Sequence, residues 1–352
     1  MTGLVRPAVA LVHPGDINTP SGGYAYDRRI LAGLKAQGFV AVPLSLKGGF
    51  PCPTADEIGA ALALLAATPP GTVLLADGLA LGALPEAGLR RIGRPVVALV
   101  HHPLALETGL SEAVAARLLQ SEAGALAAAS AVIAVSPETH RMLVERFGVP
   151  PEKITLALPG TAPAARVPAD GLPPRLIAVG SLTPRKGYGV LLDALDGLQD
   201  LDWTLTIVGS PDFEPETARE IAARAAAFGP RIRLAGALDT EALDAAYAAA
   251  DIFVHPSFYE GYGMVLAEAL RRGLPVICTT GGAAGETVPD GAGLKVPPGD
   301  ADALAAALRA LLVDPARRRT MADAAFAAGT ALPDWSDTVA VIGRVLMEVA
   351  DR

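Results

Sequence analysis

Short runs of apolar residues alternate with segments of helix length along most of this chain of 352 residues. In the first half the apolar runs are AVALVH, FVAVPL, VLLAD, VVALVHH and AVIAVS, and segments such as YAYDRRILAGLKAQG lie between them. Continuous apolar strands joined by helices are typical of a parallel sheet that helices cover on both faces. The alternation therefore predicts an α/β fold with doubly wound, Rossmann-like sheets.

The alternation stops once and then restarts, which indicates two domains. The segment PGTAPAARVPADGLPP at residues 159–174 is rich in Pro, Ala and Gly and is typical of a linker. After it come RLIAVGS, WTLTIVGS, RIRLAG, DIFVHPS and LPVICT. We expect domains at residues 1–165 and 166–332 and a last helix at 333–352, since one core seldom serves so long a chain. Ligands would bind in a cleft between the domains, at the carboxyl ends of the strands.

The composition excludes several classes of protein. Hydrophobic residues make up 51% of the chain and charged residues only 19%, which is not the composition of a disordered chain. The formal net charge is -8, and Lys and Arg form no cluster of the kind that nucleic-acid binding requires. No apolar stretch of about 18 residues is free of charges and helix breakers, so we expect no membrane span and no signal peptide.

Two further features bear on location. The helix-like SEAVAARLLQSEAGALAAA sets Arg117 against Glu112 and Glu122, which is not the basic face of a helix that docks stably on a membrane. Transient membrane contact is left open. Cys52 and Cys278 are too few for a disulfide framework or a metal site, so we expect reduced thiols and a cytoplasmic protein.

A pair of carboxylates stands in the segment EGYGMVLAEALRRGLPV. Glu260 lies in a Gly-rich loop, and Glu268 follows eight residues later inside an apolar run. If a helix begins near Gly263, the pair spans about 12 Å, roughly the reach of a nucleotide-linked sugar from ribose to hexose. The alternative is that Glu268 is a buried helix carboxylate tied to a backbone donor or to Arg271 or Arg272.

Glycines also stand where strands give way to helices. Gly22 and Gly23 precede the helix-like Tyr24 to Gln37, where free N-H groups could bind a phosphate, although an ordinary tight turn fits as well. Arg185 and Lys186 precede another helix in VGSLTPRKGYG. Charged residues before a helix are usually only solvated, but cations are mildly unfavourable there, so binding of a diphosphate and simple solvation remain two equal alternatives.

Two histidines end the apolar run VVALV. An imidazole at a strand end can donate a hydrogen bond to a sugar hydroxyl, or it can merely close the strand. His101 and His102 should point to opposite faces if the strand continues, so we expect at most one of them to face a ligand.

The order of these features resembles that of the retaining nucleotide-sugar glycosyltransferases of family 4. The features are the Gly-Gly loop, the strand-end His, the linker, GSLTPRKG, DIFVHPSFYEGYGMVLAEALRRGLPVI and GGAAGETVPDGAGLKVPPGD. That family adopts the two-domain GT-B architecture. The resemblance covers nearly the whole chain and is most specific between Gly236 and Asp300. It implies a hexosyltransferase that uses a UDP- or GDP-sugar as donor, retains the anomeric configuration and needs no metal ion or other cofactor.

The resemblance also implies roles for individual residues. Glu260 would contact the donor sugar, Glu268 the ribose and His101 the hexose, while Lys186 would bind the diphosphate. The other residues implied in donor binding are Gly22, Gly23, Ser181, Arg185, Gly261, Tyr262, Gly263 and, less securely, Glu286. Many members have Arg at the position of Ser181, so Lys186 is the only matched phosphate cation, with Arg185 as a candidate substitute.

The acceptor and several alternatives stay open. The acceptor, a saccharide, a lipid-linked sugar or a small molecule, would dock on the first domain, and the last helix would cross back to that domain and couple closure to donor binding. A nucleotide-sugar epimerase or hydrolase of the same architecture and a non-catalytic nucleotide-sugar-binding protein are the alternatives. A dinucleotide-dependent dehydrogenase is disfavoured because the first strand is not followed by GxGxxG.

Overall fold

The computed structural model describes residues 6–107 and 109–352, and these form two compact α/β units. The first unit extends to Gly160 and resumes at Pro333, and the second comprises Thr161–Leu332. The segment after Gly160 is tied to the second unit, since Val167 N donates to Arg272 O and Arg271 donates to Thr161 O. The boundary between the units therefore lies at Gly160, five residues before the boundary expected from the sequence, which was after residue 165.

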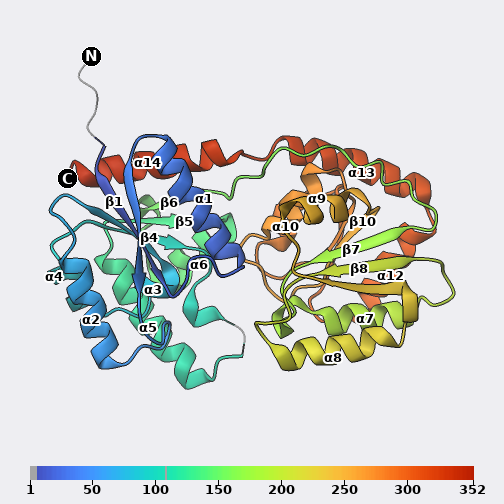
Figure 1. Ribbon diagram of the computed structural model, residues 1–352, viewed down its shortest axis with the longest axis horizontal. Helices are drawn as coiled ribbons and strands as arrows, with labels where there is room; N and C mark the ends of the chain where they lie inside the picture. Colours follow the sequence, from blue (N-terminus) through green and yellow to red (C-terminus); the bar gives the residue numbers. More distant parts are fainter. Residues whose placement is uncertain (1–5, 108) are drawn as a thin grey trace, which may run out of the picture. The chain divides into compact units, whose positions relative to one another are not determined.

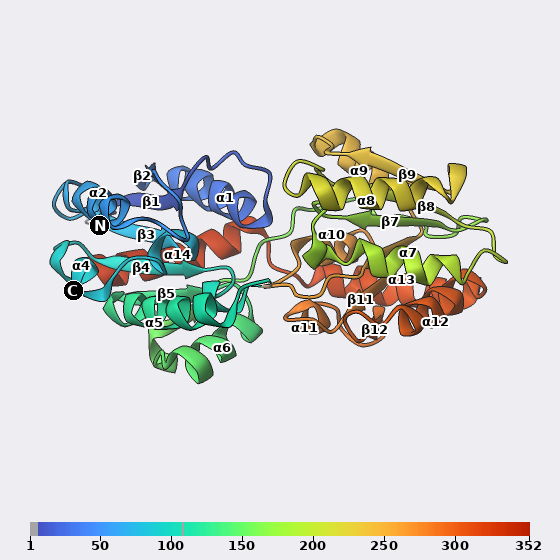
Figure 2. The same ribbon diagram turned by 90° about the horizontal axis from the view of Figure 1, so that it is seen from below.

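The first unit contains a parallel sheet of six strands in the order β2-β1-β3-β4-β5-β6, part of which can be followed in Figure 2. The strands are β1 (Ala8–Pro14), β2 (Val40–Leu46), β3 (Val73–Asp77), β4 (Val96–Val100), β5 (Ala131–Ala134) and β6 (Ile154–Leu156). The helices are α1 (Gly22–Ala36), α2 (Ala55–Ala66), α3 (Gly78–Leu81), α4 (Glu86–Arg91), α5 (Glu112–Ala128), α6 (Pro137–Phe147) and α14 (Trp335–Ala350). Figure 1 shows α1 and α14 on one face of the sheet and α2 and α5 on the other.

The second unit repeats this design with the order β12-β11-β10-β7-β8-β9. Its strands are β7 (Arg175–Val179), β8 (Thr204–Val208), β9 (Ile232–Gly236), β10 (Ile252–His255), β11 (Val276–Thr279) and β12 (Gly293–Val296). Its helices are α7 (Tyr188–Asp196), α8 (Pro215–Ala226), α9 (Thr240–Ala248), α10 (Met264–Arg271), α11 (Ala284–Thr287), α12 (Ala301–Leu312) and α13 (Pro315–Thr330).

Successive residues of one strand enter different cores in the second unit. Leu176 and Ala178 of β7 pack with α7, α8 and α12, whereas Ile177 and Val179 pack with α9, α10 and α13 (Figure 1). Side chains of a strand alternate between its two faces, so a strand covered by helices on both faces must be apolar throughout. This explains why the central strands β7, β10 and β11 are almost wholly apolar, whereas β8, β9 and β12 include Thr, Arg or Lys.

Helix α14 completes the first unit although it follows the whole second unit in the chain. One apolar stripe of this helix is buried, and consists of Val339, Ile342, Val345, Leu346 and Val349. The stripe packs on α1, where a Cβ added at Gly33 would lie 2.4 Å from Val339. The close approach of the two helices therefore depends on this glycine.

Each strand order contains one reversal, between β1 and β3 in the first unit and between β7 and β10 in the second. In open α/β sheets, ligands bind beyond the carboxyl ends of the strands at such a switch point. A ligand-binding site is therefore expected in the loops that follow these strands. Among the described residues, none of the helices is both long and apolar enough to span a membrane. Cys52 is exposed, Cys278 is buried, and both are free thiols.

Candidate functional site

The loops that follow β7 and β10 are pressed together at the switch point of the second sheet. Arg185 and Lys186 lie in a short 3-10 turn, Pro184–Lys186, just before α7. The next residue, Gly187, has φ +67°, and a Cβ there would lie 2.1 Å from the carbonyl oxygen of Pro256. Phe258 N and the Ser257 hydroxyl both donate to Arg185 O, at 2.8 and 3.1 Å. Gly187 and these hydrogen bonds to Arg185 O thus hold the backbones of the two loops together.

Glu260 is the centre of the resulting cluster. Its Oε1 accepts hydrogen bonds from Lys186 Nζ at 2.6 Å, Arg185 Nη1 at 3.3 Å and His255 Nε2 at 2.9 Å. Arg185 and Lys186 therefore both contact the same carboxylate. Their adjacent positions in the sequence did not show whether the two side chains point to one place. His255 ends β10 and is buried. We call Arg185, Lys186, His255 and Glu260 the Glu260 cluster.

Charge within the cluster keeps Glu260 ionised. Burial acts to raise the pKa of Glu260, but Lys186, His255 and Arg185 hold that pKa well below its ordinary value. Burial lowers the pKa of His255 against the opposing pull of Glu260, so this imidazole is neutral near pH 7. Two cations then face one carboxylate, and the cluster carries a net positive charge. A buried positive cluster of this kind suits a diphosphate, which can accept charge-assisted hydrogen bonds from Arg and Lys.

A third loop holds the backbone of Glu260 in place. Glu260 O accepts a hydrogen bond from Ala283 N at 2.8 Å, and Glu260 N donates to Gly281 O. A Cβ at Gly281 would lie 2.1 Å from Phe258 O, so this close approach requires glycine. Glu286 lies beyond this loop on α11, where it is exposed.

Helix α10 begins at Met264, directly after Gly263, so the condition on which the spacing of Glu260 and Glu268 was interpreted is met. Glu260 therefore precedes the helix and Glu268 lies within it. Glu268 is half-buried and accepts a hydrogen bond from the Tyr247 hydroxyl at 2.9 Å. Arg272 Nη1 donates to the backbone oxygen of Glu268, and its guanidinium lies 4.5 Å from the centre of the Tyr247 ring.

The remaining predicted residues of the second unit line the same loops. Ser181 is half-buried in the loop after β7. Tyr262, in the turn Gly261 to Gly263, is 7% exposed, and its carbonyl oxygen accepts a hydrogen bond from the Thr287 hydroxyl at 2.6 Å. This turn is therefore held at the start of α10.

In the first unit the predicted residues Gly22, Gly23 and His101 converge at the start of α1. Ser21 caps the helix, since its Oγ accepts a hydrogen bond from Tyr24 N at 3.2 Å. Gly22 has open space where a Cβ would lie, and a Cβ at Gly23 would lie 3.4 Å from Cδ2 of His101. His101 Nε2 is 2.9 Å from Asp27 Oδ1, whereas His102 Nε2 is 4.0 Å from Glu107. The two histidines therefore have different partners.

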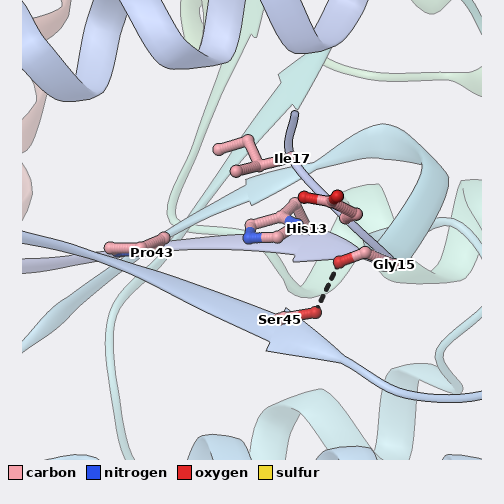
Figure 3. A pocket seen from close by; sticks show the side chains of 6 residues that line it. His13, Gly15, Ile17, Pro43 and Ser45 are labelled. Atoms are coloured by element: carbon pink, nitrogen blue, oxygen red, sulfur yellow. Dashed lines mark hydrogen bonds between the residues drawn. The ribbon is translucent and has the colours of Figure 1, made fainter. Parts of the chain in front are cut away.

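A shallow hollow lies beyond β1 in the first unit (Figure 3). Its volume is about 430 Å³, and its lining residues are His13, Gly15, Asp16, Ile17, Pro43 and Ser45. The Ser45 hydroxyl donates to Gly15 O at 2.6 Å, which joins β2 to the loop after β1. The hollow lies at the loop after His13, in the unit on which the acceptor was expected to dock.

Sequence reasoning missed His255, Tyr247, Asp27 and Asp77. His255 is the last residue of β10 and His101 directly follows β4, and this similar position at the end of an apolar run was the available signal. Asp27 lies on the same face of α1 as Ile30 and Leu34, so a carboxylate interrupts an apolar stripe. Asp77 ends VLLAD, and it is also buried. No feature of the sequence singles out Tyr247.

Two protein-family models match the chain. The model described as "Glycosyltransferase Family 4" matches residues 19–164, and the one described as "Glycosyl transferases group 1" matches residues 173–314. The first match includes Gly22, Gly23 and His101, and the second includes Lys186 and Glu260. Between them the two models thus cover the candidate residues of both units.

A curated relative and two solved structures are also similar. The phosphatidyl-myo-inositol mannosyltransferase of Mycobacterium leprae (strain TN) is 38% identical over 171 residues, which are 47% of this chain and 44% of that relative. The match thus spans less than half the length of that relative. Sucrose-phosphate synthase from Thermosynechococcus elongatus has a TM-score of 0.78 and 23% identity, with 97% of this chain and 98% of that chain covered. Anabaena HepE in complex with UDP-glucose has a TM-score of 0.74 and 19% identity, with 97% and 98% covered. The predicted GT-B fold is confirmed.

Proposed function

The chain belongs to glycosyltransferase family 4, and from this premise we propose that it transfers a hexosyl group from a UDP- or GDP-sugar to a hydroxyl group of an acceptor. The transfer proceeds with retention of anomeric configuration and without a metal ion. The observation that carries the proposal is the net positive Glu260 cluster at the switch point of the second sheet. The relative from Mycobacterium leprae is named as a mannosyltransferase, and the similar Anabaena structure contains UDP-glucose.

Lys186 and Arg185 bind the diphosphate of the donor in this proposal. As the bond between the anomeric carbon and the phosphate oxygen breaks, negative charge grows on the leaving diphosphate, and fixed cations stabilise it. Arg185 stands in for the arginine that many family members have at Ser181. This substitution is supported by the contact of both Arg185 and Lys186 with Glu260, which shows that the two side chains reach the same place.

Glu260 binds the donor sugar and Glu268 the ribose. Glu260 stays ionised, so it can accept hydrogen bonds from sugar hydroxyls. The Tyr247 hydroxyl holds Glu268 by one hydrogen bond, and a carboxylate has further lone pairs for the ribose hydroxyls. The backbone of Gly261, Tyr262 and Gly263 approaches the donor at the start of α10.

In the first unit, Gly22 and Gly23 approach the donor and His101 contacts its hexose. The acceptor binds near the hollow beside His13 (Figure 3). The acceptor oxygen attacks the anomeric carbon on the face that the diphosphate leaves, and a phosphate oxygen takes the acceptor proton. The products are the glycosylated acceptor and the nucleoside diphosphate.

The test is donor turnover by Lys186→Ala with purified UDP- and GDP-sugars and a panel of hydroxyl acceptors. Loss of a preorganised cation should lower kcat/KM by about 100-fold or more. Lys35→Ala, which removes an exposed lysine of α1, is the matched control and should keep wild-type turnover. Unchanged turnover by Lys186→Ala would contradict the assignment of Lys186 to the donor diphosphate. Breakdown of the donor that no acceptor accelerates would favour a hydrolase or an epimerase.

A further inference from the structure

A second buried cluster lies in the first unit, formed by residues from three different elements. Asp27 comes from α1, Asp77 from the end of β3, and His101 from the residue after β4. One nitrogen or oxygen atom from each side chain lies within 4.8 Å of the others. Asp27 is 0% exposed and Asp77 2% exposed. Two carboxyl groups are thus enclosed beside a single imidazole.

The hydrogen bonds of these carboxyl groups are incomplete if both are ionised. Asp27 Oδ1 pairs with His101 Nε2 at 2.9 Å, and Asp77 Oδ1 accepts a hydrogen bond from Leu79 N, also at 2.9 Å. The second oxygen of each carboxyl group, Oδ2, is buried, and no donor reaches it among the described residues. Buried acceptors without donors are costly, so both oxygens call for one explanation.

A single proton accounts for both oxygens. One oxygen of Asp77 lies within 4.8 Å of one oxygen of Asp27, and two neighbouring carboxyl groups can form a hydrogen bond only if one of them is protonated. Burial, and then the charge of Asp27, raise the pKa of Asp77 to about 7, although His101 acts to lower it. Asp77 is therefore the carboxyl group that keeps the proton.

We propose that Asp77 is a positioning residue: as a neutral carboxylic acid it donates a hydrogen bond to Asp27, which in turn holds Nε2 of His101. Tyr26 packs edge-on against the imidazole at 5.0 Å, and Gly23 lies over its Cδ2. With Nε2 on Asp27, Nδ1 is the nitrogen left to meet a ligand. The role of His101 in glycosyl transfer rests on the proposed function. The chain of hydrogen bonds from Asp77 through Asp27 to His101 does not depend on that function.

Ionisation of Asp77 would break this chain. Two charged carboxylates would then repel each other, and Asp27 would lose the donor that fixes it. The titratable groups that interact with the pair are Tyr24, Tyr26 and His101, and Asp16 acts on Tyr24. Burial and the neighbouring carboxylates raise the pKa of Tyr24 to about 12, so this phenol adds no charge near neutral pH. Burial acts to lower the pKa of His101, but Asp27 and Asp77 raise it overall. Deprotonation of Asp77 and deprotonation of His101 should therefore both reduce activity on the alkaline side.

Two substitutions separate a positioning role from a merely structural one. Asn in Asp77→Asn can accept from Leu79 N and donate from Nδ2 to Asp27, whereas Asp77→Leu has similar size and no donor. We expect Asp77→Asn to keep kcat/KM within about twofold of wild type and to shift the alkaline decline of activity from about pH 7 to higher pH, where only His101 still titrates. We expect Asp77→Leu to lose about tenfold in kcat/KM. Asp56→Asn, an exposed change on α2, is the control and should keep the wild-type pH profile.

A readout on the free protein keeps the test independent of the reaction. In ¹⁵N-histidine NMR, His101 is identified by the signal missing from His101→Gln, and its Nε2 should be protonated in wild type and Asp77→Asn but not uniformly in Asp77→Leu. Equal damage by both Asp77 substitutions, an Nε2 without a proton, or a stoichiometric divalent ion in the purified protein would overturn the proposal. If no sugar is transferred but these signals are as expected, only the proposed function fails.

Discussion

At the scale of single residues, the chemistry of this protein depends on carboxylates whose partners come from distant parts of the chain. Glu260 is held by a lysine and an arginine of the loop after β7 and by a histidine of β10. Asp27 is held by His101, which lies after β4. The pKa of a buried carboxyl group is lowered at Glu260 in one unit and raised at Asp77 in the other, because the surrounding charges differ.

The ionised state of Glu260 predicts how stability changes with pH. Its pKa in the folded protein lies well below the ordinary value of 4.5, so its contribution is complete above pH 4.5 and is lost as the pH falls through the folded pKa. Glu260→Gln should therefore be less stable than wild type at pH 7, and the difference should shrink below pH 4.5. Urea unfolding at pH 7, 5 and 3.5 measures it. A difference that stays constant with pH would contradict the ion pairs.

Glu268 should act on donor binding more than on the chemical step. Glu268→Ala is expected to raise the donor KM about tenfold with kcat little changed, since a ribose contact stabilises ground and transition states alike. Tyr247→Phe removes only the hydroxyl that holds Glu268 and should raise the same KM less. Initial rates over a range of donor concentrations separate the two parameters. A fall in kcat with an unchanged KM for the donor would contradict the assignment of Glu268 to the ribose.

At the scale of elements, the packing of α14 on α1 depends on a position with no side chain. Gly33→Ala would place a Cβ against Val339 and should destabilise the first unit by about 1 to 3 kcal/mol. Gly59→Ala, in the middle of α2 with open space around it, is the matched control and should stabilise by about 0.5 to 1 kcal/mol.

Thermal unfolding of both variants checks this prediction, and the double variant Gly33→Ala with Val339→Ala tests its cause. If the clash with Val339 is responsible, the smaller partner should restore part of the loss. A loss of stability in Gly59→Ala as large as that in Gly33→Ala would instead indicate a general intolerance of helix glycines to substitution.

The elements themselves were largely predictable, and the contacts between them were not. Unbroken apolar runs such as DIFVHPS and LPVICT mark strands because both faces of these sheets are covered, and the turn at Gly263 marks the start of α10. The loops with Arg185, Lys186 and Glu260 were found because their residue types suit phosphate and sugar. Their pairing with His255, and that of Asp27 with Asp77 and His101, depends on strand order, which local sequence does not encode.

At the scale of the whole molecule, the two units should respond differently to a nucleotide. UDP or GDP should protect the loops at residues 180–187 and 256–263 from amide hydrogen exchange, because the Glu260 cluster lies there, and should raise the stability of the second unit by mass action. Exchange measured by mass spectrometry with and without nucleotide, and with Lys186→Ala, tests this. Equal protection in the Lys186→Ala variant would place the nucleotide elsewhere.

The placement of α14 has a consequence for how the chain is made. The second unit is continuous in sequence, so it can fold as soon as residues 161–332 have left the ribosome. The first unit is synthesised earlier, yet one face of its sheet stays without α14 until residues 335–350 emerge. During that interval its apolar face is open to chaperones and to other nascent chains. The unit translated first is therefore the one that finishes folding last.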